Sequence, residues 1–234
     1  MTINKFYNNY YKTKSLNLRK DLKARKYFYE FIIRSFFPKN INSRIVDLGA
    51  GYGPLEYYGK KKNYKNITSL DLSNDQVIKA KELGVEVIQS SAIDYLKKID
   101  DSSLDFIVAI DLVEHLTILE FDALLKEIYR TLKTENYFLF HTNNADSPFF
   151  GNIRYGDLTH KIAFNESSIN QIMISNKFSK LYFRESGPFA HSFKSLVRLF
   201  FWKIIRIIYN FLYIVETGSP KKILTMNLFC YARK

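Results

Sequence analysis

Residues 45–53 read IVDLGAGYG, and this stretch decides the fold of the chain. A short apolar run reaches an acid, Asp47, and three glycines follow at alternate positions. Glycine lets the backbone turn sharply and come close to a ligand, because no Cβ is in the way. A second run, residues 67–72, also reaches an acid, Asp71. The two runs predict parallel strands whose carboxyl ends form a nucleotide site, with an acid placed for a ribose.

The spacing of the glycines narrows the class of nucleotide. A dinucleotide fingerprint needs a third glycine where this chain has Pro54 or Glu56, and the phosphate-binding G-x-x-x-x-G-K-[ST] pattern is absent. The pattern D-x-G-x-G-x-G instead resembles motif I of the class I S-adenosylmethionine-dependent methyltransferases. That resemblance implies an α/β, Rossmann-like fold with a seven-stranded mixed sheet. It also implies S-adenosylmethionine as cofactor and S-adenosylhomocysteine as product.

The resemblance assigns roles to residues along the carboxyl edge of the sheet. Asp47 and the glycine loop surround the methionine moiety and the ribose, and Asp71 accepts hydrogen bonds from both ribose hydroxyls. Leu72 packs on the adenine, and Asp111 ends the strand where the methyl group is presented. The complete set of expected cofactor contacts is Asp47, Gly49, Ala50, Gly51, Tyr52, Gly53, Asp71, Leu72, Ser91, Ala92, Asp111 and Leu112.

Charge is distributed unevenly along the 234 residues, whose net charge is +12. Residues 1–40 hold 10 Lys or Arg against 2 acids, and residues 176–234 hold 11 against 2, whereas the middle is mildly acidic. Basic flanks suit an anionic partner such as nucleic acid, a membrane surface or a phosphorylated substrate. A genome rich in A and T, which favours Lys and Asn, is the other explanation. One cysteine excludes a disulfide framework, and the N-terminus lacks an apolar signal core, so we expect a cytoplasmic protein.

The length of 234 residues predicts one domain over residues 1–234, and the resemblance implies that it is a methyltransferase domain. Its parts are an N-terminal basic helical cap (1–40) that covers the site, a nucleotide-binding core (41–185), a helical insertion (186–223) and a last strand (224–234). The expected helices cover 16–37, 54–62, 74–83, 92–98, 119–132 and 166–176. The expected strands cover 44–48, 67–72, 85–89, 104–110, 136–142, 179–185 and 224–232, with a loop over 143–165.

The insertion contains an amphipathic segment, residues 193–215, that reads FKSLVRLFFWKIIRIIYNFLYIV. At helical spacing, its polar and large aromatic side chains share one sector and its aliphatic residues fill the remaining arc. Two interior cations argue against a membrane span. Packing on the chain's own domain, a homodimer, and peripheral contact with the inner face of a membrane remain open. The polar sector consists of Arg198, Trp202, Lys203, Arg206, Tyr209, Asn210 and Tyr213.

Oxygen methylation is the reaction that elimination leaves. Carbon methylation of pyrimidines uses a cysteine nucleophile, but the single thiol, Cys230, lies in the last strand. Methylation of the amino groups of bases typically uses an Asn/Asp-Pro-Pro segment after the fourth strand, and this sequence has none there. A hydroxyl acceptor benefits from a general base. We expect His160, oriented by Asp157, or His115 in that role. His141 is expected to be buried and satisfied and His191 is a weaker candidate, and their spacing predicts no metal site.

Three downstream segments resemble methyltransferases of bacterial capsule, lipopolysaccharide and exopolysaccharide biosynthesis. They are residues 156–160 (GDLTH), 187–191 (GPFAH) and 198–202 (RLFFW). The resemblance implies methylation of a sugar hydroxyl, or of a phosphate or phosphoramidate-type group, on an anionic small molecule or glycan. RNA methylation, although nucleic acid is disfavoured, and a non-catalytic partner subunit are the alternatives. The expected anion contacts are Lys12, Lys14, Arg19, Lys20 and Arg154.

Overall fold

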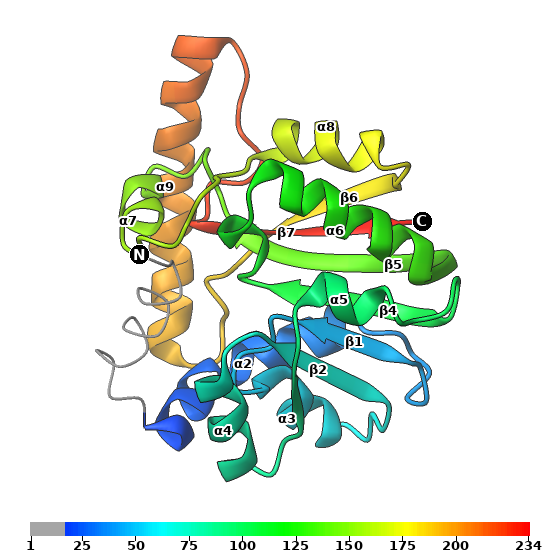
Figure 1. Ribbon diagram of the computed structural model, residues 1–234. Coiled ribbons are helices and arrows are strands. Elements are labelled where there is room, and N and C mark those ends of the chain that lie inside the picture. The colour runs from blue at the N-terminus through cyan, green and yellow to red at the C-terminus, as the bar shows by residue number, and fades with distance from the viewer. Residues whose placement is uncertain (1–16) are drawn as a thin grey trace.

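The computed structural model describes residues 17–234 and shows a seven-stranded sheet with helices on both faces (Figure 1). The strand order is β3-β2-β1-β4-β5-β7-β6, and β7 runs antiparallel to both of its neighbours. This confirms the expected Rossmann-like, seven-stranded mixed sheet. The strands are β1 (Ile45–Leu48), β2 (Ile67–Asp71), β3 (Val87–Gln89), β4 (Leu104–Ile110), β5 (Leu132–Asn143), β6 (Ser179–Glu185) and β7 (Asn227–Arg233).

The helices follow the alternating order that the sequence predicts, with two additions. Residues 113–115 form one 3₁₀ turn, η1, and the stretch 143–165, expected as a loop, contains a short helix, α7. Single turns carry too few residues for a hydrophobic period to show. The helices are α2 (Leu18–Phe36), α3 (Pro54–Lys60), α4 (Asn74–Glu82), α5 (Ala92–Leu96), η1 (Val113–His115), α6 (Ile118–Thr131), α7 (Phe150–Arg154), α8 (Glu166–Ser175) and α9 (Phe193–Thr217).

Strand β4 is the centre of the core because both of its faces are covered. One face packs with α6 and α8, where Phe121 and Met173 are fully buried. The other face packs with α2 and α3, where Ile32 and Leu55 are buried. Strands buried on both sides read as continuous apolar runs, as LDFIVAI does. The helix predicted over 16–37 is therefore an integral layer of the fold, and it also reaches the sheet edge where the expected site lies.

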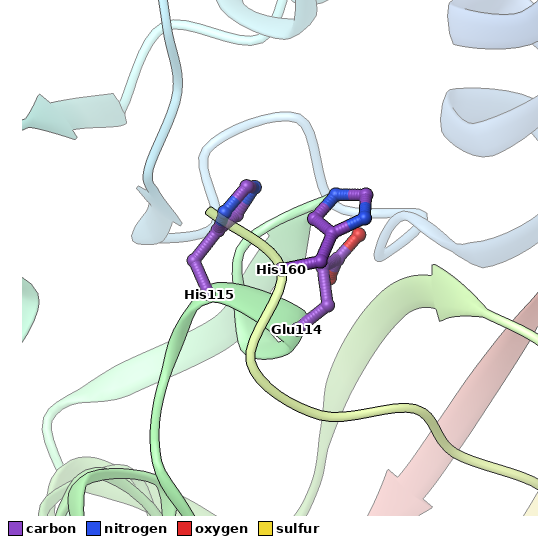
Figure 2. A group of neighbouring side chains, drawn as sticks. All are labelled: Glu114, His115 and His160. Atoms are coloured by element: carbon purple, nitrogen blue, oxygen red, sulfur yellow. The ribbon is translucent and has the colours of Figure 1, made fainter. Parts of the chain in front are cut away.

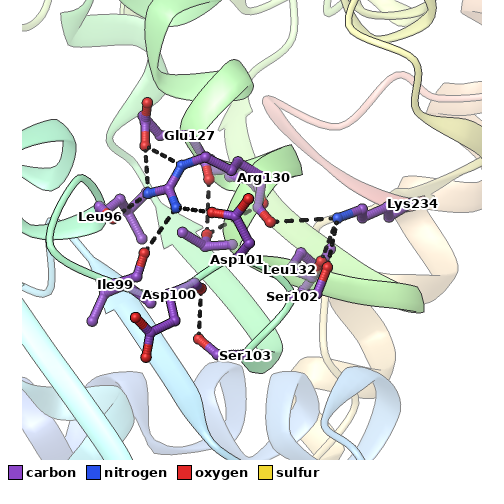
Figure 3. Close-up of polar contacts among 12 residues, drawn as sticks. Leu96, Ile99, Asp100, Asp101, Ser102, Ser103, Glu127, Arg130, Leu132 and Lys234 are labelled. Atoms are coloured by element: carbon purple, nitrogen blue, oxygen red, sulfur yellow. Dashed lines mark hydrogen bonds and ion pairs between the residues drawn. The ribbon is translucent and has the colours of Figure 1, made fainter.

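Arg130 fixes the opposite, amino-terminal edge of the sheet (Figure 3). Its guanidinium donates to the carbonyl oxygens of Leu96 and Ile99 at 2.8 and 2.9 Å, and it pairs with Glu127 and Asp101. These bonds tie the segment between α5 and β4 to α6. The planar fork of arginine satisfies several acceptors at once, which a lysine ammonium does not do with the same geometry. This network supports the scaffold at a distance from the expected site.

Helix α9 lies along one side of the molecule and extends past it (Figure 1). Most of the sector that the sequence marks as polar and aromatic faces the body, whereas its Arg198 and Lys203 are exposed. Arg206 pairs with Glu185, Tyr213 donates to the Asp146 carbonyl at 2.9 Å, and Trp202 lies beside Phe149. The apolar arc is exposed, with Phe193 at 81% and Ile207 at 69%. Within residues 17–234 no helix is long and apolar enough to cross a membrane.

Candidate active site

A cavity of about 280 Å³ opens at the carboxyl edge of β1, β2 and β4. The glycine loop forms its floor, η1 and the loop after β5 form one wall, and α2 covers it. Strand order places the ends of these strands side by side, which is where parallel α/β sheets bind ligands. The polar residues that line it are Asp21, Arg25, Tyr29, Asp47, Tyr52, Asp71, Gln76, Asp111, Glu114, His115, Asp157, His160 and Asn227.

Glycine is favoured at the three loop positions for different structural reasons. All have left-handed φ angles, +69° at Gly49, +58° at Gly51 and +75° at Gly53, where a Cβ is strained. A Cβ at Gly49 would lie 2.9 Å from the Leu112 side chain, and one at Gly53 would lie 2.5 Å from Val85. A Cβ at Gly51 would meet nothing closer than 3.8 Å. Gly49 and Gly53 are therefore required for packing, whereas Gly51 leaves its space for a ligand.

Asp71 organises the loop from the end of β2. Its Oδ2 accepts from the Gly51 N–H and its Oδ1 from the Ser73 N–H, both at 2.8 Å. Each carboxylate oxygen has a further lone pair, so the side chain can also accept two hydroxyls. Burial raises the pKa of Asp71, and the two N–H donors offset this only in part. Burial, together with the charges of Glu56 and Asp71, raises the pKa of Asp47 well above its ordinary value.

Gln76 is a buried amide without a partner in the described part of the chain. Its exposed fraction is 1%, and neither its Nε2 nor its Oε1 has a hydrogen-bond partner there. The side chain lines the cavity beside Gly51. Because an unpartnered buried amide costs free energy, its position indicates a polar ligand that fills this cavity. Acids placed for hydroxyls, an open Gly51 and this orphaned amide together fit the adenosyl and amino-acid groups of S-adenosylmethionine.

Helix α2 contributes the cover of the cavity. The Tyr52 hydroxyl donates to Asp21, and the Arg25 guanidinium donates to the Tyr29 hydroxyl at 3.2 Å. Burial raises the pKa of Tyr29 to about 12, although the charge of Arg25 acts in the opposite direction. The tyrosine is therefore neutral at physiological pH. These side chains close the site over the loop, so the basic cap is part of the pocket.

Asp111 is held in an unusual conformation at the end of β4. Its φ is +54°, a left-handed angle that is costly for a residue with a Cβ. Its Oδ1 bonds to His141 Nδ1, and His141 Nε2 bonds to Ser186 Oγ at 2.7 Å. Burial opposes ionisation of Asp111, but the charge and hydrogen bond of His141 hold its pKa below the ordinary value. His141 is buried and satisfied, as expected.

The remaining wall brings together Glu114, His115 and His160 (Figure 2). Each offers a ligand atom, and these atoms all lie within 4.8 Å of one another. The first two come from η1 and the third from the loop after α7. Glu114 is 3% exposed and accepts from the Thr142 hydroxyl at 3.0 Å. Burial, then the charge of Asp111, raises the pKa of Glu114 well above its ordinary value.

Two hydrogen bonds fix the tautomers of the histidines. His160 Nδ1 lies 3.0 Å from the carbonyl oxygen of Ile153, so Nδ1 carries the proton. The Thr159 hydroxyl donates to Asp157 at 2.6 Å, and its oxygen therefore accepts from His115 Nδ1 at 2.9 Å. Both Nε2 atoms are thus unprotonated in the neutral rings. Burial, and then the charge of His160, lowers the pKa of His115. Asp157 was expected to orient His160; through Thr159 it orients His115.

Most of the expected site residues meet in this cavity. The lining includes His115, Asp157 and His160, and also Asp47, Gly49, Ala50, Gly51, Tyr52, Asp71 and Asp111. Five expected contacts are not among the lining residues: Gly53, Leu72, Ser91, Ala92 and Leu112. Of these, Ser91 caps α5, Leu112 packs on Gly49 and Leu72 is 63% exposed, and their adenine contacts stay predictions. Lys12 and Lys14 lie outside the described residues.

Sequence reasoning missed several lining residues, namely Asp21, Arg25, Tyr29, Gln76 and Asn227. Residues Asp21, Arg25 and Tyr29 recur on one face of the first helix at spacings of four, which is a signal that a sequence can show. Nothing local marks Gln76 or Asn227, because their position depends on how α4 and β7 pack.

Comparisons with known proteins agree with this geometry. Residues 46–140 match a family model described as "Methyltransferase domain". No curated protein matches the sequence. Among solved structures, the chain is similar to an S-adenosylmethionine-dependent methyltransferase from Archaeoglobus fulgidus, with a TM-score of 0.67 and 20% identity over 90% of this chain and 94% of that one.

Two other structures resemble the fold while their stated substrates differ. Geranyl diphosphate C-methyltransferase from Streptomyces coelicolor has a TM-score of 0.61 and 13% identity over 94% of this chain and 85% of that chain. Phosphoethanolamine N-methyltransferase 2 from Haemonchus contortus has a TM-score of 0.58 and 18% identity over 88% of this chain and 52% of that chain. At such identities the likeness shows the fold, and the acceptor has to be argued from this chain's own residues.

Proposed function

We propose that this chain, whose residues 46–140 match the methyltransferase-domain model, uses S-adenosylmethionine to methylate a sugar hydroxyl during synthesis of a bacterial surface polysaccharide. The observation that carries the proposal is a single cavity that joins the ribose acid, Asp71, to the histidine wall of His115 and His160. One end is suited to the cofactor and the other to an acceptor oxygen. The resemblance of residues 156–160 and 187–191 to surface-glycan enzymes supports the substrate class.

The cofactor supplies a methyl group on a positively charged sulfonium, which an acceptor oxygen displaces in line. Asp71 is placed to accept the ribose hydroxyls, and Gly51 gives the space that the ligand needs. Asp47 and the orphaned amide of Gln76 offer polar partners to the remaining groups. Positioning of this kind is the main task of an enzyme that catalyses a displacement.

The charge of the cavity favours a hydroxyl acceptor over a phosphoryl oxygen. In the described part of the chain, six carboxyl side chains line it against one guanidinium, that of Arg25. Burial raises the pKa of Asp47, Asp71 and Glu114, but the acids that are ionised attract the sulfonium cation and repel a second anion. An alcohol must lose its proton during transfer, and a neutral Nε2 of His115 or His160 can receive it. When the sugar is attached to a phosphate-bearing carrier, the phosphates stay outside the acidic cavity and lie near the exposed Arg19 and Lys20 on the outer side of α2.

Helix α9 supports a location of the acceptor at a membrane surface. Its exposed arc is apolar, and Lys194, Arg198 and Lys203 lie exposed along the same helix. At helical spacing Lys194 and Lys203 flank the arc on its two sides. An apolar face with a cationic rim is the pattern of a helix that lies in an anionic membrane interface. We therefore propose peripheral contact through 193–215, and a homodimer through the same face is the competing outcome.

A panel of acceptors tests the proposed reaction. The purified full chain would be incubated with S-adenosylmethionine and, separately, with nucleotide sugars, phospho-sugars and glycolipids, and S-adenosylhomocysteine would be measured. We expect product with a sugar hydroxyl, located by mass spectrometry, and little with a phosphomonoester that lacks free hydroxyls. Methylation confined to phosphoryl oxygen, to nitrogen or to RNA would refute the proposal. His191→Ala is the control variant and should transfer the methyl group as the wild type does, because His191 stacks on Tyr27 and does not line the cavity.

A further inference from the structure

The wall of Glu114, His115 and His160 has a composition that a general base does not require. A base needs one imidazole, yet here two imidazoles and a buried carboxylate converge, with ligand atoms within 4.8 Å (Figure 2). Two histidines and one carboxylate on one side of an open cavity form a ligand set for divalent transition metals. We propose that these three residues bind such a metal ion, and that the ion contacts the acceptor oxygen; the second part rests on the proposed hydroxyl methylation.

The hydrogen bonds around the wall prepare it for a metal. A ligating imidazole needs an unprotonated nitrogen and commonly donates its other N–H to a carbonyl or a polar side chain. His160 Nδ1 donates to the Ile153 carbonyl, and His115 Nδ1 donates to the Thr159 hydroxyl. In both rings this leaves Nε2 as the ligand atom. Asp157 anchors Thr159 through its backbone N–H and its hydroxyl, at 2.8 and 2.6 Å.

The carboxylate is oriented in the same way. The Thr142 hydroxyl on strand β5 donates to Glu114 Oε2 at 3.0 Å and holds the buried carboxylate in one orientation. Asp111 and Asp157 also line the cavity and add negative charge without being needed as ligands. Ions of this class lie about 2.0–2.2 Å from nitrogen and oxygen ligands, so binding draws the three atoms together by roughly 1 Å. Two imidazoles favour Zn²⁺, Mn²⁺, Fe²⁺ or Co²⁺ over Ca²⁺ or Mg²⁺.

Three protein ligands leave coordination positions open toward the cavity, which is the arrangement of a catalytic metal site. An acceptor hydroxyl in an open position would be polarised and would ionise more readily. Its O–H bond breaks and the proton passes to water at the cavity mouth. The new O–CH₃ bond forms as the S–CH₃ bond breaks, and the sulfonium becomes a neutral thioether. In the metal-bound site the two histidines hold the ion through Nε2, so these atoms no longer receive the proton as they do in the metal-free site.

Direct metal titration tests the site without any methyl acceptor. The untagged full chain, treated with a chelator, would be titrated with Co²⁺ by visible absorbance, and Zn²⁺ would be used in competition. We expect one ion per chain. His160→Ala and Glu114→Gln should bind about 100-fold more weakly or worse, because each removes a ligand. Thr159→Val, which removes only the partner of a ligand, should weaken binding about 10-fold. His191→Ala should bind as the wild type does.

The outcomes separate the metal from the proposed function. Folding of each variant would be checked by circular dichroism and by S-adenosylhomocysteine affinity, and His160→Asn replaces His160→Ala if the latter is unstable. Equal Co²⁺ affinity in wild type and His160→Ala, or no binding by wild type, overturns the metal site. Full methyl transfer to a sugar hydroxyl by the chelator-treated protein overturns the role of the metal in the reaction, while the proposed function stands. Metal binding with no transfer to any hydroxyl supports the site and refutes the proposed function.

Discussion

Replacement of Asp71 by alanine tests the assignment of the cofactor end of the cavity. The carboxylate accepts the N–H groups of Gly51 and Ser73 at 2.8 Å and has lone pairs left for two hydroxyls. Hydrogen bonds to a charged acceptor contribute about 1.5–3 kcal/mol. The dissociation constant for S-adenosylhomocysteine should therefore rise by about 10- to 150-fold in Asp71→Ala. The measurement is isothermal titration calorimetry.

The same substitution should change the stability of the free protein much less. Alanine leaves two backbone N–H groups without their acceptor, but water in the cavity can reach them. The substitution also removes a carboxyl whose pKa is raised by burial, and whose charge is therefore costly in the folded state. We expect the free energy of unfolding to fall by less than about 1.5 kcal/mol. Glu86→Ala, which removes an exposed acid just before β3, is the control. Unchanged ligand affinity in Asp71→Ala, or a loss explained wholly by unfolding, would refute the reasoning.

Three further predictions concern pH, the scaffold and α9. The folded-state pKa of Asp47 lies well above 3.8, so the ligand-free protein should lose stability as pH rises from 3.8 toward that pKa. Asp47→Asn should flatten this dependence in urea unfolding at several pH values and should weaken cofactor binding; an unchanged slope contradicts it. Arg130→Ala should lower the free energy of unfolding by about 1.5–3 kcal/mol with cofactor affinity retained, since it removes bonds to two carbonyls remote from the site; equal stability in chemical denaturation counts against this. The full chain should co-sediment with anionic liposomes at low salt and less in high salt or after Lys194→Glu and Lys203→Glu; a stable dimer without sedimentation favours the subunit interface.

The fold class and the cofactor end of the site could be predicted from the sequence because their signals are local. Asp47 and the three glycines of residues 45–53 lie within one strand and one turn, and Asp71 ends the next strand. Left-handed φ angles and close packing favour glycine at the three loop positions, and burial on both faces gives β4 its continuous apolar pattern. A reader of the sequence can therefore place strand ends at one sheet edge before any contact is known.

The acceptor end was decided by the tertiary structure. Folding brings His115 of η1 next to His160, which follows α7, and both elements are too short to show a hydrophobic period in the sequence. The tautomers of the two histidines depend on Thr159 and on the carbonyl of Ile153. For this reason the sequence predicted no metal site, whereas the structure brings a ligand set together. Helix α9 is a similar case: the sequence showed two faces, but packing alone determined that the polar face meets the body and the apolar face meets solvent. Periodicity records that a helix has two faces, and only the neighbouring elements determine which one is covered.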